Sequence, residues 1–434
     1  MNINFVFDTM FEHRVFKANI IDVSVDNGVR PNWYEWGTHI HRHLPWDKNI
    51  PTKHSIEFVS VDEVIDSIQQ PDTLNIYPIF CHSTALAYPW PLVYLSQRVI
   101  NLINSNRLKV LLSCTFENCP ENVELMIHTL HLVLKRQGIT RSDNIILACT
   151  DFKLQEQIEK HHHLSIFGDM PRPKFVNLDI YQSQTFQIIQ KFWSNYKLEN
   201  FLDVYDSGKP KEKIFLYLNG RPVEWRYLLF KSFEMEGLLA DALYSFRNSA
   251  TAKKVLGDID VTQNHWIKYH KPLAEFIKAL PNIAERQLLE NHKENFHWAP
   301  LEVGSYMEKD WIQKTYFSVV TETHIGPYTS QVTEKINKLF YYCHPFIVLG
   351  SKGVLKEVRR LGYKTFPMLF DESYDDMDYG FEKIKFITEQ VKQYTTAKGK
   401  KKLEKLMPEL REILAYNRER FISQDIYDKY ANLK

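Results

Sequence analysis

The sequence predicts an α/β protein of two domains, each built on a parallel sheet. Three observations support this prediction. At 434 residues the chain is too long for one ordinary hydrophobic core. Apolar runs of strand length alternate with helix-length amphipathic segments, a rhythm typical of parallel strands joined by crossover helices. A polar stretch at residues 197–213, which contains Gly208 and Pro210, divides this alternation of strands and helices into two halves. It is the predicted linker between the domains.

In the amino-terminal half, we predict strands at residues 3–8, 74–81, 109–116 and 144–150, with helices after the last three. Polar residues follow those strands, and ligands of parallel sheets bind at the carboxyl ends of the strands. Glu117 is the predicted catalytic base, because a partly desolvated carboxylate there could deprotonate an acceptor hydroxyl. His82 and Asp151 could substitute for it. The alternative is that Glu117 simply precedes a helix.

Aromatic residues gather in two segments of the same half. Trp33, Trp36 and Trp90 are predicted to contact the acceptor, since aromatic rings stack on sugars and bases. The histidines at 39, 41 and 43 alternate, and a metal site there is conceivable. Because neither a carboxylate nor a cysteine completes the set nearby, we favour a surface or acceptor-facing strand.

In the second half, strands are predicted at residues 214–218, 242–246, 315–321 and 346–349. The first of these runs into Asn219 and Arg221, directly before Pro222, which suits the first turn of a helix. The fork of donors on an arginine matches a diphosphate. Asn219 and Arg221 are therefore predicted to bind a ligand that carries a diphosphate.

The strand at residues 315–321 ends at Glu322, and the next helix is expected to start at Thr333. A threonine hydroxyl caps a helix, whose amino terminus favours an anion. With Lys335 in the first turn, this is a plausible diphosphate cradle, and Glu322 or Glu334 could bind ribose or sugar hydroxyls. The alternative is a plain capped helix with solvated charges.

Several motifs in residues 210–425 resemble the carboxyl half of glycosyltransferases encoded by phages. They are Thr-Glu-Thr from 321, Val-Thr-Glu-Lys from 332, His-Pro-Phe-Ile-Val-Leu-Gly from 344, Leu-Gly-Tyr-Lys-Thr-Phe from 361 and Asp-Glu-Ser-Tyr-Asp from 371. That half is similar in outline to the donor domain of fucosyltransferase-like GT-B enzymes. The resemblance implies that Thr333, Glu334 and Lys335 contact a nucleotide-sugar.

The same resemblance implies a GT-B-like fold, in which two Rossmann-like domains with parallel sheets face a central cleft. We expect an acceptor domain at residues 1–205 and a nucleotide-sugar-binding domain at 206–400. The terminal helices at 401–434 are then expected to cross back to the amino-terminal domain. A basic run, Lys398 to Lys402, precedes the last predicted helix at 403–422. It is either a solvated turn or a phosphate-contacting patch.

Composition excludes several other classes. The net charge of +1 argues against a protein that coats nucleic acid nonspecifically. Neither a Walker loop nor a Gly-x-Gly-x-x-Gly fingerprint occurs, which argues against kinases and classical dehydrogenases. The five cysteines form no metal-type pair and suggest reduced thiols. Without a signal peptide or an apolar run of membrane-spanning length, we expect a cytoplasmic protein that does not enter membranes.

Asp376 and Asp378 have the spacing of a metal-binding signature, but acidic residues are ordinary before a helix. We therefore predict no metal site and no required cofactor. Asp371 and Glu372 are expected near the sugar, because we read the segment before them as a strand that returns to the same edge of the sheet.

The resulting prediction is an enzyme that moves a sugar from a nucleoside-diphosphate sugar, first of all a UDP-sugar, to an acceptor hydroxyl. The expected acceptor is 5-hydroxymethylcytosine or a similar pyrimidine in phage DNA, flipped out of the duplex. The alternatives are a surface or virion glycan as acceptor, and a non-catalytic protein that binds a nucleotide-sugar or a glycan. We expect a monomer or a weak dimer.

Overall fold

The protein is described by a computed structural model. It describes residues 1–7, 24–25, 29–30, 52–68, 70–81, 92–93, 95–114, 123–150, 153, 156, 170–178, 182, 185–186, 189, 200–206, 209–219, 224–246, 304–305, 307–322, 325–326, 330–425 and 427–434. The chain divides into two compact units. The first comprises Met1–Gln187, Tyr328–Gln331 and Gln424–Lys434, and the second comprises Ile188–Pro327 and Val332–Ser423. The domain limits expected at residues 205 and 400 remain predictions.

The first unit is built on a sheet of six strands in the order β4-β1-β5-β6-β7-β8, and every neighbouring pair is parallel. The strands are β1 (Asn2–Phe7), β4 (Ser55–Ser60), β5 (Thr73–Cys81), β6 (Lys109–Cys114), β7 (Ile145–Cys149) and β8 (Lys174–Asn177). Short strands β2 (Ser24–Val25) and β3 (Val29–Arg30) pair antiparallel elsewhere.

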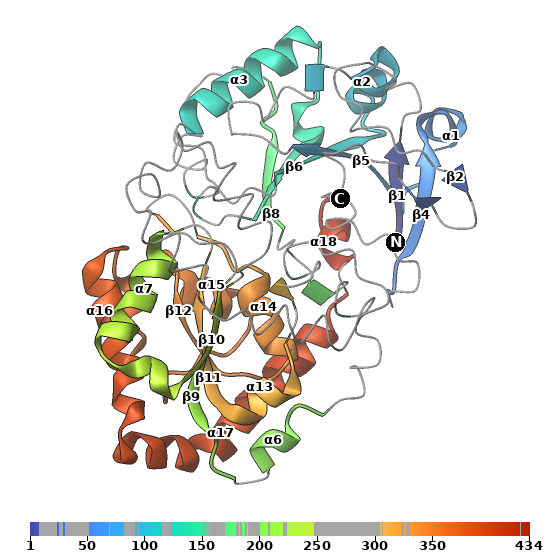
Figure 1. The fold of residues 1–434 in the computed structure, drawn as a ribbon. Coiled ribbons are helices and arrows are strands. Elements are labelled where there is room, and N and C mark those ends of the chain that lie inside the picture. The colour runs from blue at the N-terminus through green and yellow to red at the C-terminus, as the bar shows by residue number, and fades with distance from the viewer. Residues whose placement is uncertain are drawn as a thin grey trace. The chain divides into compact units, whose positions relative to one another are not determined.

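Helices α1 (Val61–Asp66), α2 (Gln97–Asn104) and α3 (Val123–Arg136) cover the convex side of this sheet, as Figure 1 shows. Apolar side chains from these helices and from the central strands form one core. Helix α18 (Asp428–Ala431) lies on the concave side, where Tyr430 meets the ring of Phe5 edge-on at 5.5 Å. The C-terminal residues thus belong to the amino-terminal unit.

The strands β4 and β8 and the helix α1 are absent from our sequence prediction. Both strands are edge strands, and β8 has only four residues, too few for a clear alternation. Helix α1 is one and a half turns long and depends on a local capping box, in which Ser60 and Glu63 bond each other's backbone N–H groups. Short elements of this kind carry little periodic signal.

The second unit contains a parallel four-stranded sheet in the order β10-β9-β11-β12. The strands are β9 (Lys213–Asn219), β10 (Ala242–Phe246), β11 (Thr315–Thr321) and β12 (Phe346–Leu349). The prediction of α/β architecture with parallel sheets is confirmed.

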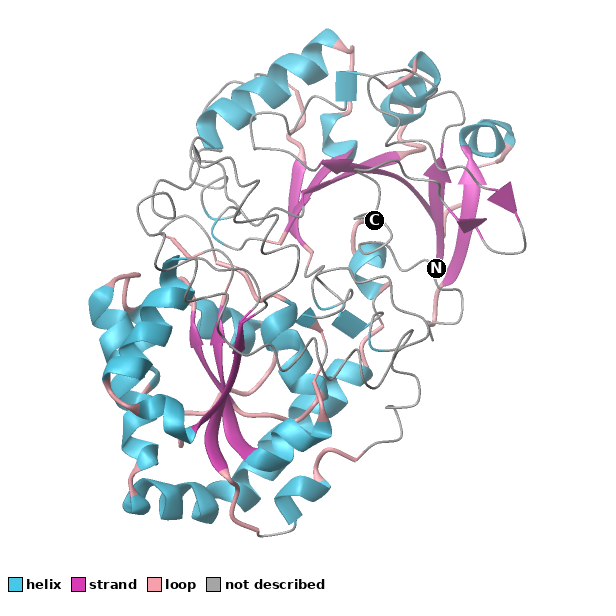
Figure 2. Cartoon of the chain, in the orientation of Figure 1, coloured by secondary structure: helices cyan, strands magenta, loops and turns pink. Residues whose placement is uncertain are grey.

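Helices lie on both faces of the second sheet (Figure 2). One face carries α7 (Glu224–Met235) and α16 (Phe381–Lys392), and the other carries α13 (Lys309–Lys314), α14 (Glu334–Tyr341) and α17 (Ala397–Ile422). Further short helices are α6 (Asp203–Asp206), α15 (Val354–Arg360), and the 3-10 turns Ser142–Asn144, Leu238–Asp241, Glu372–Asp376 and Gln393–Thr395.

The segment predicted as a linker contributes to the core of the second unit. Phe201 packs edge-on against Tyr342 at 5.2 Å, and the Tyr205 hydroxyl donates to Cys343 O at 2.7 Å. Lys211 is buried, and its ammonium donates to Ile312 O at 2.6 Å and to Thr315 O at 2.7 Å. Polar composition alone therefore misrepresents this segment, because Phe201, Tyr205 and Lys211 are used in packing.

The last long helix begins earlier than the sequence suggests. Helix α17 starts at Ala397 with Thr396 as N-cap, so the lysines of the basic run lie in its first turns and not in a turn before it. Tyr316, near the start of β11, donates to Glu404 in the second turn of α17 at 3.3 Å. The basic run therefore lies near the amino ends of the strands, away from their carboxyl ends.

The segment before Asp371 forms turns and no strand, so the reason given for placing Asp371 and Glu372 near a sugar is wrong. Glu372 instead accepts from Arg359 Nη1 at 2.8 Å and from Phe366 N at 2.9 Å. Asp371 caps the following 3-10 turn through the N–H of Ser373. These carboxylates stabilise local structure.

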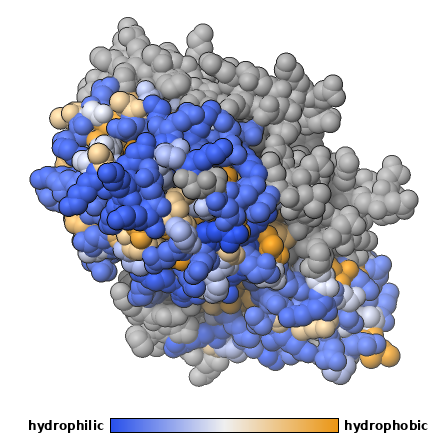
Figure 3. All heavy atoms as spheres, turned by 90° about the horizontal axis from the view of Figure 1, so that it is seen from below, coloured by the Kyte–Doolittle hydropathy of each residue, from blue (hydrophilic) through white to orange (hydrophobic). Residues whose placement is uncertain are grey.

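In the part of the chain that the structure describes, no helix is long and apolar enough to cross a membrane. Figure 3 shows one face of the molecule, on which the described residues are mostly hydrophilic and the apolar ones are scattered in small groups. Scattered apolar side chains of this kind are normal on a folded protein.

Candidate functional site

The carboxyl end of β11 places Glu322 deep in the second unit. All seven residues of β11 are buried between β9 and β12. The N–H of Glu322 donates to Leu349 O at 3.0 Å, so backbone pairing continues one residue past the strand. Glu322 is only 2% exposed. A carboxylate at this depth is stable only if it accepts hydrogen bonds or meets a cation.

Thr333 supplies those hydrogen bonds from the start of α14. Its N–H donates to Glu322 Oε1 at 3.1 Å, and its hydroxyl donates to Oε2 at 2.6 Å. The same hydroxyl oxygen caps the helix by accepting from the N–H of Lys335 at 3.4 Å. The prediction that Thr333 begins this helix is confirmed. A carboxylate from within the fold therefore already lies where such a helix start attracts an anion.

Lys335 connects the two carboxylates of this group. Its ammonium lies 2.8 Å from Glu334 Oε1 and 3.8 Å from Glu322 Oε2, and it donates to Thr333 Oγ1 at 3.2 Å. The Lys335 side chain is 20% exposed, against 10% for Glu334 and 3% for Glu322. We call Glu322, Thr333, Glu334 and Lys335 the strand-end network. Lys335 is its most accessible member.

A second lysine balances the charge of the network. Lys338 lies one turn further along α14, and burial lowers its pKa to about 8, although Glu334 acts in the opposite direction. Burial also raises the pKa of Glu322, opposed mainly by Lys335 and by the hydrogen bond from Thr333. When Glu322, Glu334 and both lysines are ionised, two carboxylates are balanced by two ammonium groups. The network can then exchange one internal ion pair for a pair with a ligand.

The neighbouring strand end adds Asn219, which is 5% exposed. Among the residues that the structure describes, neither of its amide atoms has a well-aligned hydrogen-bond partner, an uncommon state for a buried polar group, although the amide lies close enough to the Tyr217 hydroxyl to oppose part of the rise in that group's pKa. The adjacent Tyr217 hydroxyl donates to Arg226 O at 3.0 Å and lies 3.3 Å from Thr321 Oγ1. An amide presents both a donor and an acceptor, so Asn219 is equipped to bind a ligand that offers both.

Helix α7 brings two residues to this edge that sequence reasoning missed. Trp225 donates its indole N–H to Glu322 O at 2.9 Å and meets the ring of Tyr379 at 6.0 Å. Arg226 is buried, and its guanidinium approaches Thr321 O at 3.4 Å. The sequence signal that could have pointed to these two residues is their place in the first turn of the helix predicted after Pro222. For Lys338 the signal was its spacing of four residues from Glu334, which suits an ion pair on a helix.

The structure thus brings together Glu322, Thr333, Glu334 and Lys335, and it places Asn219 at the adjoining strand end. The remaining predicted site residues lie outside the described part of the chain. They are the donor ligand Arg221, the candidate bases His82, Glu117 and Asp151, and the acceptor-contacting Trp33, Trp36 and Trp90. The alternating histidines at 39, 41 and 43 also lie outside it.

In the first unit, unpartnered polar atoms occur at the corresponding edge. Thr150 follows β7 and is buried, and its hydroxyl has no hydrogen-bond partner among the described residues. Asn177 ends β8, and within the same part of the chain neither of its buried amide atoms has a partner. Its neighbour in register is Cys149, the residue before Thr150. Both sheets therefore carry unsatisfied polar groups at the carboxyl ends of their strands.

Comparison of the chain with models of protein families, with curated proteins and with solved structures finds no match.

Proposed function

We propose that this protein is a glycosyltransferase of the GT-B type, which transfers a sugar from a nucleoside-diphosphate sugar to an acceptor hydroxyl. The observation that supports this most is the strand-end network, which combines an accessible ammonium with buried carboxylates at the start of α14. Parallel sheets bind their ligands at this edge. The two parallel-sheet units, and the assignment of residues 424–434 to the first of them, are compatible with this proposal.

The donor would bind through Lys335. A phosphate oxygen replaces Glu334 as the partner of this ammonium, and the helix dipole of α14 adds to the attraction. Both groups then stabilise the charge that develops on the departing diphosphate, without requiring a metal. Asn219 would bind an uncharged part of the nucleotide-sugar that offers both a hydrogen-bond donor and a hydrogen-bond acceptor. Arg221 is proposed as a second diphosphate ligand.

Acceptor activation is assigned to the amino-terminal unit. Glu117 is proposed as the base that takes the proton of the acceptor hydroxyl, with His82 and Asp151 as substitutes. The proposed acceptor is a hydroxymethylated pyrimidine in DNA, held by Trp33, Trp36 and Trp90. Binding of DNA through phosphates weakens steeply with salt, whereas binding of a neutral glycan does not. A salt titration of acceptor binding therefore separates the two kinds of acceptor.

A thermal-shift screen of UDP-, GDP- and CMP-sugars tests the donor proposal. A donor at about 100 times its dissociation constant should stabilise the protein by about 2.7 kcal/mol. Lys335→Ala should weaken binding about 10- to 100-fold, since charge-assisted hydrogen bonds contribute about 1.5–3 kcal/mol. Glu334→Gln should strengthen it, because Lys335 loses an internal partner. Lys392→Ala, which removes an exposed lysine paired with Glu236, is the matched control.

If no nucleotide-sugar shifts the melting temperature, the proposed function loses its main support. If one binds and the Lys335 variant binds it equally well, the donor lies elsewhere. A donor that binds without turnover on any acceptor, or even on water, would identify a non-catalytic binding protein.

A further inference from the structure

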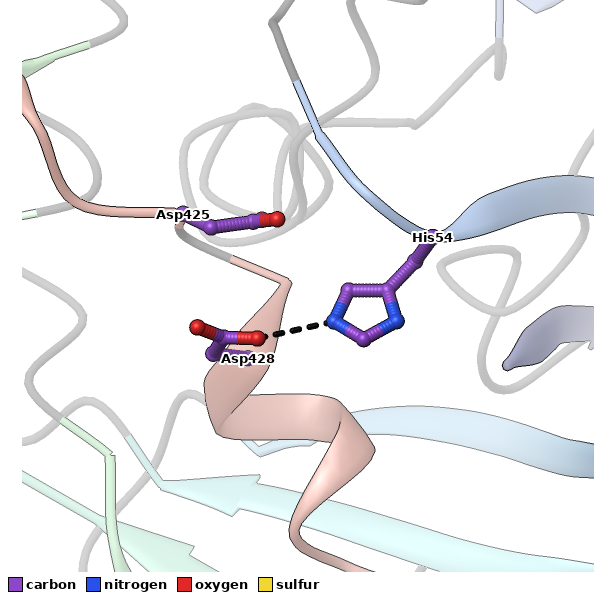
Figure 4. A group of neighbouring side chains, drawn as sticks. All are labelled: His54, Asp425 and Asp428. Carbon is purple, nitrogen blue, oxygen red and sulfur yellow. Dashed lines mark hydrogen bonds and ion pairs between the residues drawn. The ribbon is translucent and has the colours of Figure 1, made fainter.

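A second group of ligand-type side chains lies in the first unit, apart from the strand-end network. His54 lies immediately before β4. Asp428 is the first residue of α18, and Asp425 lies three residues before it. One ligand atom from each of the three residues lies within 4.8 Å of the other two. Figure 4 shows the imidazole and both carboxylates facing one another. The fold thus brings His54 together with two aspartates that lie 371 or more positions further along the sequence.

We propose that His54, Asp425 and Asp428 form a divalent-cation site that fastens the C-terminal segment to the first sheet. One imidazole nitrogen and two carboxylate oxygens are a donor set that suits Zn²⁺ and Mn²⁺. Zinc bonds these atoms at about 2.0–2.2 Å, so its ligand atoms lie about 3.4 Å apart in a tetrahedral site. His54 Nε2 and Asp428 Oδ1, now 2.8 Å apart, would separate slightly to reach that spacing, and all three ligand atoms already lie within 4.8 Å of one another. Water completes the coordination.

The surrounding structure orients two of the three ligands in advance. Asp425 Oδ2 accepts from the Thr52 hydroxyl at 2.9 Å and from the N–H of Lys53 at 3.0 Å. Its Oδ1 accepts from the N–H of Tyr427 at 3.0 Å. The side chain of His54 is 8% exposed, which restricts its ring, and Nε2 lies 2.8 Å from Asp428 Oδ1. Hydrogen bonds of this kind hold metal-binding carboxylates in place.

Lys53 already supplies a positive charge to one of the three ligands. Its ammonium lies 2.9 Å from Asp428 Oδ1, and its side chain is 68% exposed. Exposed ion pairs of this type contribute little and are easily exchanged. A divalent cation would therefore displace the Lys53 ammonium, together with the proton on His54 Nε2, and would neutralise both aspartates. Lys53 is thus a competitor of the ion, and its removal should strengthen metal binding.

This competition gives the test. The full-length protein, stripped with a chelator, is titrated with ZnCl₂ and separately with MnCl₂ by isothermal calorimetry. We expect one site per chain that is weakened at least 10-fold by His54→Gln and by Asp428→Asn. Lys53→Met keeps all three ligands and should bind the ion at least threefold more tightly. Asp143→Asn, which alters another aspartate paired with a basic residue in the same unit, is the control and should bind as the wild type does.

Two results would overturn the proposal. If neither ion binds with a dissociation constant below about 100 µM, the group is only an ion-pair contact between β4 and α18. If an ion binds equally well to the His54 and Asp428 variants, it binds elsewhere, for example at the other histidines of the chain. Circular dichroism of each variant separates loss of the site from loss of the fold. Because Lys53→Met removes no ligand, its tighter binding would remain a decisive measurement even if another variant unfolds.

Discussion

At the scale of single residues, burial decides which charged groups can meet a ligand. Glu322 lies almost fully inside the second unit and is already bonded twice by Thr333, whereas Lys335 retains access to solvent. The sequence places both residues at the strand end but does not distinguish their depths. A buried, satisfied carboxylate stabilises the helix start, while the partly exposed ammonium of Lys335 can exchange one of its partners.

The hydroxyl of Thr333 should be important for stability. Thr333→Val removes its bond to Glu322 Oε2 and the cap on the N–H of Lys335. Leaving a buried carboxylate with one donor fewer should cost about 1–3 kcal/mol, measured by urea unfolding. Thr333→Ser keeps the hydroxyl and should recover most of the loss. Equal stability of the valine variant and the wild type would contradict this account of the network.

His344 should make the second unit sensitive to acid. Its Nε2 lies 3.2 Å from Thr315 O, which can only accept, so Nε2 carries the proton and Nδ1 accepts from the Ser318 hydroxyl at 2.7 Å. Burial, with Lys211 nearby, lowers the pKa of His344 to about 3. The unfolded chain therefore binds a proton that the folded chain refuses between about pH 6.5 and pH 3.

Stability should accordingly fall as the pH drops through that window. The loss attributable to His344 should be about 2 kcal/mol between pH 7 and pH 5. Urea unfolding of the wild type and of His344→Gln at both pH values measures it, because glutamine does not titrate. The comparison uses the change with pH and not the absolute stability of the variant. If both proteins lose the same amount, His344 is not the cause.

At the scale of secondary-structure elements, packing fixes where a helix begins. The sequence suggests a turn at Lys398–Lys402, since lysines cluster around a glycine. In the structure Gly399 lies inside the first turn of α17, where a Cβ atom would come within 2.0 Å of Gln393 O and 2.7 Å of Tyr394 Cα. The glycine is needed for this close approach, and the Thr396 cap on its N–H marks the earlier start of the helix.

Gly399→Ala should therefore destabilise the protein by about 1–3 kcal/mol, as expected for overpacking. Alanine is the better helix former by about 1 kcal/mol, so a stabilised variant would show that the contact relaxes freely. Gly380→Ala is the control, because a Cβ atom there meets nothing within 4 Å and the backbone is extended. Differential scanning calorimetry of both variants gives the comparison.

At the scale of the whole molecule, the chain returns to its first unit at the end. Residues 424–434 belong to that unit, where Tyr430 packs on Phe5 of β1 and Asp425 and Asp428 meet the residues before β4. The resemblance to GT-B enzymes leads to the expectation that terminal helices cross back, but the contacts that hold them cannot be seen in the sequence.

Deletion of residues 424–434 should therefore weaken the first unit more than the second. Removing the Tyr430 ring from Phe5 should cost about 3–5 kcal/mol, the range for truncating a buried aromatic residue. Hydrogen exchange should accelerate in β1 and β4 and remain unchanged in β9 and β11. Lys434→Ala, which removes only the side-chain ammonium that contacts Pro71 O and Asp72, is the control. Uniform acceleration in both sheets would contradict this assignment of the segment.

The sequence by itself determined the α/β class, the strand at Thr315–Thr321 and the helix start at Thr333, because local periodicity and capping chemistry specify them. It also placed Glu322, Glu334 and Lys335 at one edge, since parallel strands end on the same side. Only the tertiary structure decided how deep each charge lies, that Asn219 is buried at the end of β9, and that His54 meets Asp425 and Asp428. Those facts depend on contacts between distant segments, which no local pattern encodes.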